Sequence, residues 1–197
     1  ASGNATFASD VPFVLDGGEL VTATATDPAG NTSEFSQRIV FETDPISGSA
    51  SGGTSTTISG MLFEPGGATV TVGGVAATNV DVQSEFAIVA TMPALPPGSL
   101  NDVTVTTPSG LSGTLRNGWL ADFSDVPQGN IFHDDVEKIF RAAITAGCGG
   151  GNYCPSSPVT RAQMAVFLLK TEHGSAYAPP ACHGAFGDVP CPGPFTN

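Results

Sequence analysis

The run Val70-Thr71-Val72-Gly73-Gly74 carries the pattern that decides the fold of this chain. Val70 and Val72 alternate with a polar residue, so their side chains lie on one face of a β-strand. Gly73-Gly74 is a natural hairpin turn to the next strand. The same period of two recurs at Phe86 and Ile88 and at Val103 and Val105, and Pro96-Pro97-Gly98 breaks the chain before the last strand. The spacing therefore predicts an antiparallel β-sandwich.

Composition agrees with a mainly β chain built of small modules. The chain has 197 residues, which is enough for one domain or a few small ones. Its 25 Gly and 16 Pro suit strands joined by tight turns, while charged residues, at 12%, leave few side chains for long surface helices. We expect several β modules, followed by a short helical one.

The acidic balance of the chain excludes several classes of function. A formal net charge of −12, with only 6 Lys and Arg, repels phosphate and argues against nucleic acid or anionic lipid as a partner. It leaves weak surface binding of Ca²⁺ open, and no other cofactor is predicted. The longest apolar stretch, near Met164 to Leu169, is far shorter than the roughly 20 residues that cross a bilayer. The opening residues read as a turn and not as a signal peptide, so we expect a processed secreted protein or an internal fragment.

Four cysteines lie in the last quarter of the chain, at Cys148, Cys154, Cys182 and Cys191. Four cysteines allow three pairings, and their setting among Gly, Pro and aromatic residues favours the local pairs Cys148–Cys154 and Cys182–Cys191. The alternative is a zinc site that adds His183, although neither pair has the tight spacing of a zinc knuckle. Two disulfides imply an oxidising, extracellular setting.

Residues 1–44 read as the closing part of a β domain. Leu20-Val21-Thr22-Ala23-Thr24-Ala25-Thr26 alternates as a strand, and a further strand is expected over residues 34–40. Residues 2–7 and 21–36 resemble the end of bacterial Ig-like repeats found in very large secreted proteins. The resemblance implies that partner strands come from upstream or from another chain, because so few strands are not stable alone.

Residues 45–120 resemble an IPT/TIG domain, which is an immunoglobulin-like β-sandwich. The residues that carry the resemblance are Pro45-Ile46-Ser47-Gly48, Gly52-Gly53-Thr54, Ile58-Ser59-Gly60-Met61-Leu62-Phe63, Val70-Thr71-Val72-Gly73-Gly74 and Thr107-Pro108-Ser109-Gly110. The single tryptophan, Trp119, ends this region. We expect Trp119 to fill the junction with the next module, with stacking on a sugar as the alternative.

The period changes from two to helical over residues 122–174. One helical face is expected from Val136, Ile139, Phe140, Ala143 and Ile144, with acidic residues at its start and Gly147 at its end. A second helix is predicted to begin at Thr160, where Gln163 completes a capping box, and to stop near His173-Gly174.

This layout resembles an S-layer homology (SLH) repeat over residues 121–185. Phe123-Ser124-Asp125-Val126 matches the opening motif of the family, and Val159-Thr160-Arg161-Ala162-Gln163-Met164-Ala165 matches the entry to its second helix. Phe186-Gly187-Asp188-Val189-Pro190 repeats the opening motif, so residues 186–197 are expected to start a second, truncated repeat. Members of the family bind envelope polysaccharide, in characterised cases a pyruvylated cell-wall polymer.

The resemblance places the polysaccharide contact at Arg161, with Thr160 beside it. A guanidinium at a helix N-terminus suits an anionic sugar substituent. Gln163 stands where the family usually has Glu, and the cysteine-rich loop is also atypical. The alternative is that Arg161 braces packing between repeats, on Asp125 or Asp188.

For the remaining polar residues, a structural role is expected before a binding or catalytic one. Asp125 and Asp188 are expected to cap a turn or pair with an arginine. Ca²⁺ binding is the alternative, and the absence of an EF-hand loop around these residues argues against it. The three histidines, His133, His173 and His183, are isolated and belong to no zinc-hydrolase or triad motif. No catalytic residue is predicted.

The sequence thus predicts a non-catalytic, extracellular structural or anchoring protein at the cell surface. The β modules would be spacers or lateral contacts, and the SLH-like module would tether them to envelope polysaccharide. Two alternatives stay open. The chain is a subunit of a self-assembling surface layer or filament, in which a neighbouring chain completes the N-terminal β domain. Otherwise it is the accessory C-terminal region of a secreted enzyme or adhesin.

Overall fold

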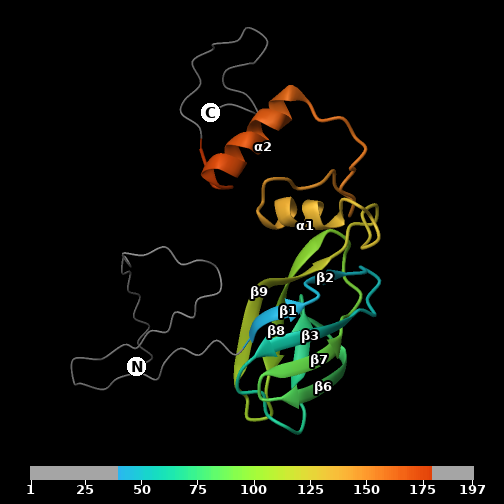
Figure 1. Ribbon diagram of the computed structural model, residues 1–197. Coiled ribbons are helices and arrows are strands. Elements are labelled where there is room, and N and C mark those ends of the chain that lie inside the picture. Colours follow the sequence, from blue (N-terminus) through green and yellow to red (C-terminus); the bar gives the residue numbers. More distant parts are fainter. Residues whose placement is uncertain (1–39, 179–197) are drawn as a thin grey trace, which may run out of the picture.

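The computed structural model describes residues 40–178 of the chain. A β-sandwich comes first, and two helices follow it (Figure 1). The fold is therefore mainly β with a small helical part, as the sequence predicts. The strands are β1 (Val40–Asp44), β2 (Ser47–Gly48), β3 (Ser55–Gly60), β4 (Thr69–Val72), β5 (Val75–Ala76), β6 (Thr78–Ser84), β7 (Ala87–Thr91), β8 (Ser99–Thr106) and β9 (Ser112–Ala121).

The strands form two sheets, with the orders β1-β3-β7-β6 and β2-β9-β8-β4-β5. Most neighbours pair antiparallel, and β2 runs parallel to β9 through Ser47 and Gly48. The chain therefore changes sheets between β1 and β2, so that β1 belongs to one layer and β2 to the other. Gly73 and Gly74 form the β4–β5 turn with positive φ values of 57° and 82°, as the sequence predicts for this hairpin.

One apolar core fills the space between the sheets. Along each strand, core residues alternate with residues that point outward, because successive side chains lie on opposite faces of a sheet. Its fully buried members include Ile58, Val72, Ile88, Val103 and Trp119. Trp119 is 0% exposed and belongs to this core, so the expectation that it fills the junction with the helical part is corrected. Its burial also leaves no face on which a sugar can stack.

Three details of the strands differ from the sequence-based expectation. Phe86 is 57% exposed in the turn between β6 and β7, whereas Ile88 is buried as expected and shares the core face of β7 with Ala90. The break at residues 96–98 precedes two further strands, β8 and β9, and not only the last one. Strand β1, in the range expected for the N-terminal domain, pairs with β3 and extends the sandwich before residue 45. The remaining division of the chain into domains stays a prediction.

The helices are α1 (His133–Arg141) and α2 (Arg161–His173). α1 lies across one end of the sandwich, and α2 lies beyond α1 (Figure 1). α2 has the predicted bounds and cap. α1 ends earlier than expected, at Arg141 with Ala142 as its C-cap, because Ala143 adopts a left-handed conformation (φ 54°) several residues before Gly147. No helix within residues 40–178 is long and apolar enough to span a membrane.

Candidate functional site

A buried ion pair joins the end of the sandwich to the start of α1. The His133 Nε2 atom lies 3.0 Å from Oδ1 of Asp122, which directly follows β9. The Nδ1 atom of the same ring lies 3.2 Å from Oδ1 of Asp134. Asp122 and His133 are both buried, and the backbone amide of Asp122 donates to the carbonyl of Gly48 in β2. The expectation that His133 is isolated is therefore wrong.

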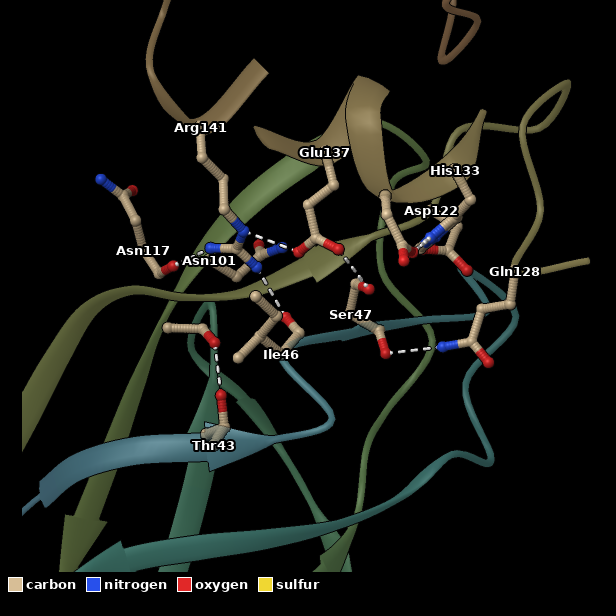
Figure 2. A network of polar contacts seen from close by, with 12 residues as sticks. Thr43, Ile46, Ser47, Asn101, Asn117, Asp122, Gln128, His133, Glu137 and Arg141 are labelled. Carbon is tan, nitrogen blue, oxygen red and sulfur yellow. Dashed lines mark hydrogen bonds and ion pairs between the residues drawn. The ribbon is translucent and has the colours of Figure 1, made fainter. Parts of the chain in front are cut away.

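A second polar contact lies one turn further along α1 (Figure 2). The buried carboxylate of Glu137 accepts a hydrogen bond from the Ser47 hydroxyl at 2.9 Å and another from Nε of Arg141 at 2.7 Å. The two other nitrogens of Arg141 donate to the carbonyls of Asn117 and Ile46, each at 2.7 Å. Arg141 thus donates to one backbone carbonyl within β9 and to another just before β2, while Glu137 neutralises its charge. We call Asp122, His133, Glu137, Arg141 and Ser47 the junction.

Apolar side chains fill the space beside the junction. Phe123 packs edge-on against Phe140 of α1, with ring centroids 4.9 Å apart, and against Tyr153, at 5.3 Å. Val126 and Val136 complete this buried cluster. Such aromatic pairs stabilise a contact by about 0.5–1.5 kcal/mol beyond their buried area. The opening motif of the helical part is therefore a packing element.

A disulfide-closed loop is docked on the same cluster. Cys148 and Cys154 are bonded, with Cα atoms 5.9 Å apart, which confirms the first predicted pair. The Asp125 carboxylate caps the end of this loop by accepting from the amides of Tyr153 (2.8 Å) and Cys154 (2.7 Å). At Gly151 the φ angle is +79°, and a Cβ atom would lie 2.4 Å from Pro97 Cγ. Only glycine allows the loop to approach the sandwich this closely.

Two grooves border these contacts. One of about 500 Å³ runs between the sandwich edge and α1, and the buried His133 and Glu137 in its lining already have protein partners. The other, of about 760 Å³, separates α1 from α2, and its lining includes Phe140, Tyr153, Gln163, Val166, Phe167 and Lys170. Across it, Nζ of Lys170 donates to the carbonyl of Ala143 at 3.1 Å. Within residues 40–178, no group of three or more His, Cys, Asp or Glu side chains is placed to hold a metal ion.

Burial and charge act in opposite directions on the ionisable groups of the junction. Burial lowers the pKa of His133, but the hydrogen bonds to Asp122 and Asp134 and the charges of Asp122 and Glu137 outweigh it. The pKa of His133 is therefore raised above its ordinary value of 6.5. Burial raises the pKa of Asp122 above 3.8, and Glu137 adds to the rise, while the hydrogen bond and charge of His133 oppose it.

The raised pKa of His133 predicts a pH-dependent stability. Because the folded chain holds this proton more tightly than the unfolded chain, the stabilisation is complete below pH 6.5 and is lost as pH rises through the folded pKa. One proton gives a slope of at most about 1.4 kcal/mol per pH unit. We expect the free energy of unfolding, measured by urea titration between pH 6 and 9, to fall with rising pH. His133→Gln should flatten this slope, and His173→Gln, at the exposed end of α2, should not. A slope that survives His133→Gln would assign the effect to another group.

The predicted polysaccharide contact lies at the start of α2. Thr160 is the N-cap, and its hydroxyl accepts from the amide of Gln163 at 3.2 Å. The side-chain oxygen of Gln163 accepts in turn from the amide of Thr160 at 3.0 Å, so the amide side chain closes the capping box as a glutamate would. Arg161 is exposed and forms no ion pair with any residue in the described part of the chain.

The structure distinguishes among the predicted site residues. Asp125 is occupied by two loop amides, so in this structure it caps a turn and does not brace Arg161. Trp119 and Arg161 are not brought together, because Trp119 is in the sandwich core. The predicted roles of Asp188, Cys182, Cys191 and His183 fall outside the described residues and stay predictions.

Sequence reasoning missed the junction, although a signal for it exists. His133, Glu137 and Arg141 recur every four residues along α1, on the flank of the apolar Val136–Phe140 pair. Polar residues at this spacing share one side of a helix. A polar row directly beside an apolar stripe is a pattern that indicates a helix buried against a polar surface.

Two family models match adjacent parts of the chain. The IPT/TIG domain matches residues 40–117, and the S-layer homology domain matches residues 122–165. The first range covers the sandwich from the start of β1 to residue 117, within β9. The second range begins at the junction residue Asp122. No curated protein sequence matches the chain significantly.

Three similar solved structures share only weak likeness with the chain. An auxiliary nutrient binding protein from Bacteroides ovatus is 20% identical, with a TM-score of 0.35, over 43% of this chain and 21% of that one. The extracellular region of Plexin A4 is 23% identical, with a TM-score of 0.33, over 44% and 8%. The SGBP-B protein of a Bacteroides ovatus mixed-linkage glucan utilization locus, in complex with a mixed-linkage heptasaccharide, is 24% identical, with a TM-score of 0.29, over 47% and 26%.

The chain thus spans about a quarter or less of the length of these three proteins, and TM-scores this low support no conclusion about function. The family matches are specific by comparison, because they agree with the sandwich, the helices and the motifs described above. This chain therefore combines an IPT/TIG domain at residues 40–117 with an S-layer homology domain at residues 122–165.

Proposed function

We propose that the chain belongs to a non-catalytic surface protein that is tethered to cell-envelope polysaccharide through its S-layer homology domain. The sandwich serves as the spacer, and Arg161, with Thr160 beside it, contacts the polysaccharide. The S-layer homology domain indicates association with the cell surface, and both domains are of non-catalytic types.

The observation that carries this proposal is the environment of Arg161. Its guanidinium is exposed in the first turn of α2 and has no ion-pair partner within residues 40–178. The closed capping box holds Thr160 and Gln163 in place, so the helix start is ordered before a ligand arrives. First-turn amides and a guanidinium together favour an anionic group, and a guanidinium can bind a carboxylate with two parallel hydrogen bonds.

The chain has a geometry that suits a tether. The junction connects the sandwich to α1 through buried polar contacts, and Lys170 connects the end of α1 to α2. A load on the sandwich is therefore transmitted to the helical module through side-chain contacts as well as through the connecting residues.

Retention of the chain on purified envelope polysaccharide tests the proposal. We expect Arg161→Ala to reduce retention at least tenfold, which corresponds to about 1.4 kcal/mol of binding free energy. Retention of Arg161→Lys should lie between that of the wild type and that of Arg161→Ala, because an ammonium keeps the charge but loses the bidentate geometry. Added salt should weaken binding of the wild type.

Arg116→Ala is the matched control, because Arg116 is an exposed arginine on strand β9 of the sandwich. It removes the same charge from the other domain and should leave retention unchanged. Equal retention of the wild type and Arg161→Ala would remove Arg161 from the site. Absence of binding by the wild type would overturn the tether itself.

A further inference from the structure

We propose that Asn117 is a modification site, at which the folded chain converts the side-chain amide into a carboxylate through attack by the backbone nitrogen of Gly118. This inference concerns the chemistry of β9 where it contacts α1, and it does not depend on polysaccharide binding. Three observations carry it: an irregularity in β9, the free side chain of Asn117, and the contact that Arg141 makes with the peptide group that reacts.

The pairing of β8 with β9 is irregular around Asn117. The register shifts there, so that residues 116–118 of β9 lie opposite the single residue Asp102 of β8. Asn117 has a positive φ of 51°, a conformation in which asparagine is enriched. At Gly118 a Cβ atom would lie 2.7 Å from Cδ2 of Leu115, so close packing favours glycine. The bulge thus places asparagine directly before the residue that hinders attack on its side chain least, because glycine has no side chain.

The side chain of Asn117 is free to turn toward the peptide bond that follows it. Asn117 is exposed, and within residues 40–178 its side-chain amide has no hydrogen-bond partner. Its backbone is held instead. The Asn117 amide donates to Oδ1 of Asp102 at 2.8 Å, and the Asn117 carbonyl accepts from Nη1 of Arg141 at 2.7 Å. The side chain points away from the guanidinium (Figure 2), so no existing contact has to break before the reaction.

Arg141 contacts the peptide group whose nitrogen is the nucleophile. The carbonyl of Asn117 and the amide nitrogen of Gly118 belong to one peptide bond. When the nitrogen loses its proton, resonance therefore places part of the negative charge on the carbonyl oxygen. A guanidinium that donates to this oxygen stabilises that charge. Arg141 thus promotes attack by the Gly118 nitrogen through the same hydrogen bond that holds α1 against β9.

The reaction consumes one water molecule and releases one ammonia molecule. The deprotonated nitrogen of Gly118 forms a bond to Cγ of Asn117, the bond from Cγ to Nδ2 breaks, and Nδ2 takes up a proton and leaves as ammonia. Water then opens the resulting cyclic imide at one of its two carbonyl carbons, and nothing is oxidised or reduced. Opening at Cγ gives aspartate. Opening at the other carbon gives isoaspartate, in which the carbonyl group that Arg141 contacts becomes a free carboxylate.

Peptide mapping of the full chain by mass spectrometry, after incubation of the folded protein at mildly alkaline pH, tests this proposal. We expect the mass change of an amide-to-acid conversion at Asn117, with isoaspartate among the products. It should precede any comparable change at Asn152, which is followed by the bulky Tyr153. A folded chain that keeps the Asn117 amide, while the same chain in urea loses it, would overturn the proposal, because the fold would then protect the site.

The variant Arg141→Gln tests the activating contact. It should slow the reaction of the folded chain about tenfold, the effect on a rate of losing one charge-assisted hydrogen bond. Loosening of the bulge alone would change the rate in the opposite direction. Glu137→Gln is the matched control, because it weakens the same junction but leaves Arg141 in place, and it should not slow the reaction.

In urea, where the contact is absent, the wild type and Arg141→Gln should react at the same rate. Circular dichroism shows whether the folded comparison is made between folded chains. The comparison of folded with unfolded wild type does not need the variant at all. An equal or faster reaction in folded Arg141→Gln would overturn the activating role of Arg141.

Discussion

Replacing Glu137 with alanine is expected to lower the free energy of unfolding by about 3 kcal/mol, measured by urea denaturation at neutral pH. The change removes the carboxylate that, among the described residues, pairs with Arg141 and accepts from the Ser47 hydroxyl. Arg141 would keep its two carbonyl acceptors but would hold an uncompensated charge against the sandwich. The Arg141 side chain is 22% exposed, so water reduces this cost and the value lies at the lower end for a broken buried pair.

Asp135→Ala is the control for this variant. Asp135 is an exposed carboxylate in the first turn of the same helix, so its loss removes only a weak interaction with the helix dipole, worth about 0.5 kcal/mol. Glu137→Gln should cost less than Glu137→Ala, because the amide oxygen can still accept a hydrogen bond from Ser47, although it no longer neutralises Arg141. Equal stability of Glu137→Ala and Asp135→Ala would show that the junction does not hold α1 on the sandwich.

Replacing Trp119 with alanine is expected to destabilise the sandwich by about 3–5 kcal/mol, the range for large-to-small changes of a buried aromatic. Trp119 is 0% exposed in the core between the two sheets. Within residues 40–178, its buried indole nitrogen has no hydrogen-bond partner. Trp119→Phe should therefore cost less, because the smaller ring sacrifices no hydrogen bond. Thermal unfolding monitored by circular dichroism measures both variants.

Phe132→Ala provides the contrast for the tryptophan series. Phe132 is 53% exposed just before α1, so its truncation should change stability by no more than about 0.5 kcal/mol. If Trp119→Ala were as mild as Phe132→Ala, the tryptophan would not be a core residue. A loss of polysaccharide retention without a loss of stability in Trp119→Ala would place it in a binding site instead.

Local patterns predicted much of the fold, because local interactions decide those features. The Val70–Val72 alternation with its two glycines produced the expected hairpin, since φ > 0 at both turn positions is a local requirement. The α2 cap followed from the spacing of Thr160 and Gln163 alone. The Cys148–Cys154 pair is separated by six residues, and a short glycine-rich loop brings its ends together.

The failures occurred where distant contacts override local preference. Phe86 has the right period for a strand, but the chain turns there, so that only Ile88 of the predicted Phe86 and Ile88 pair reaches the core. Ala143 ends α1 early although it fits the helical stripe. Trp119 was expected at a junction because it is last in its domain. The β8–β9 pairing carries it into the core instead.

The junction could not be predicted because its partners are far apart in sequence. Ser47 and Glu137 are separated by 90 residues, and Ile46 and Arg141 by 95. No local rule links a short strand near the start of the sandwich with a helix that follows its last strand. Only the parallel pairing of β2 with β9 brings Ser47 to the end of the sandwich where α1 begins.

Residual dipolar couplings of backbone amides in the full chain test the central claim, that the sandwich and α1 form one rigid unit. Relative motion is the usual expectation for two domains joined by a small interface. The junction predicts that amides of β8, β9 and α1 fit a single alignment tensor. Two tensors that differ in magnitude or orientation would show that α1 moves independently, and they would contradict the account.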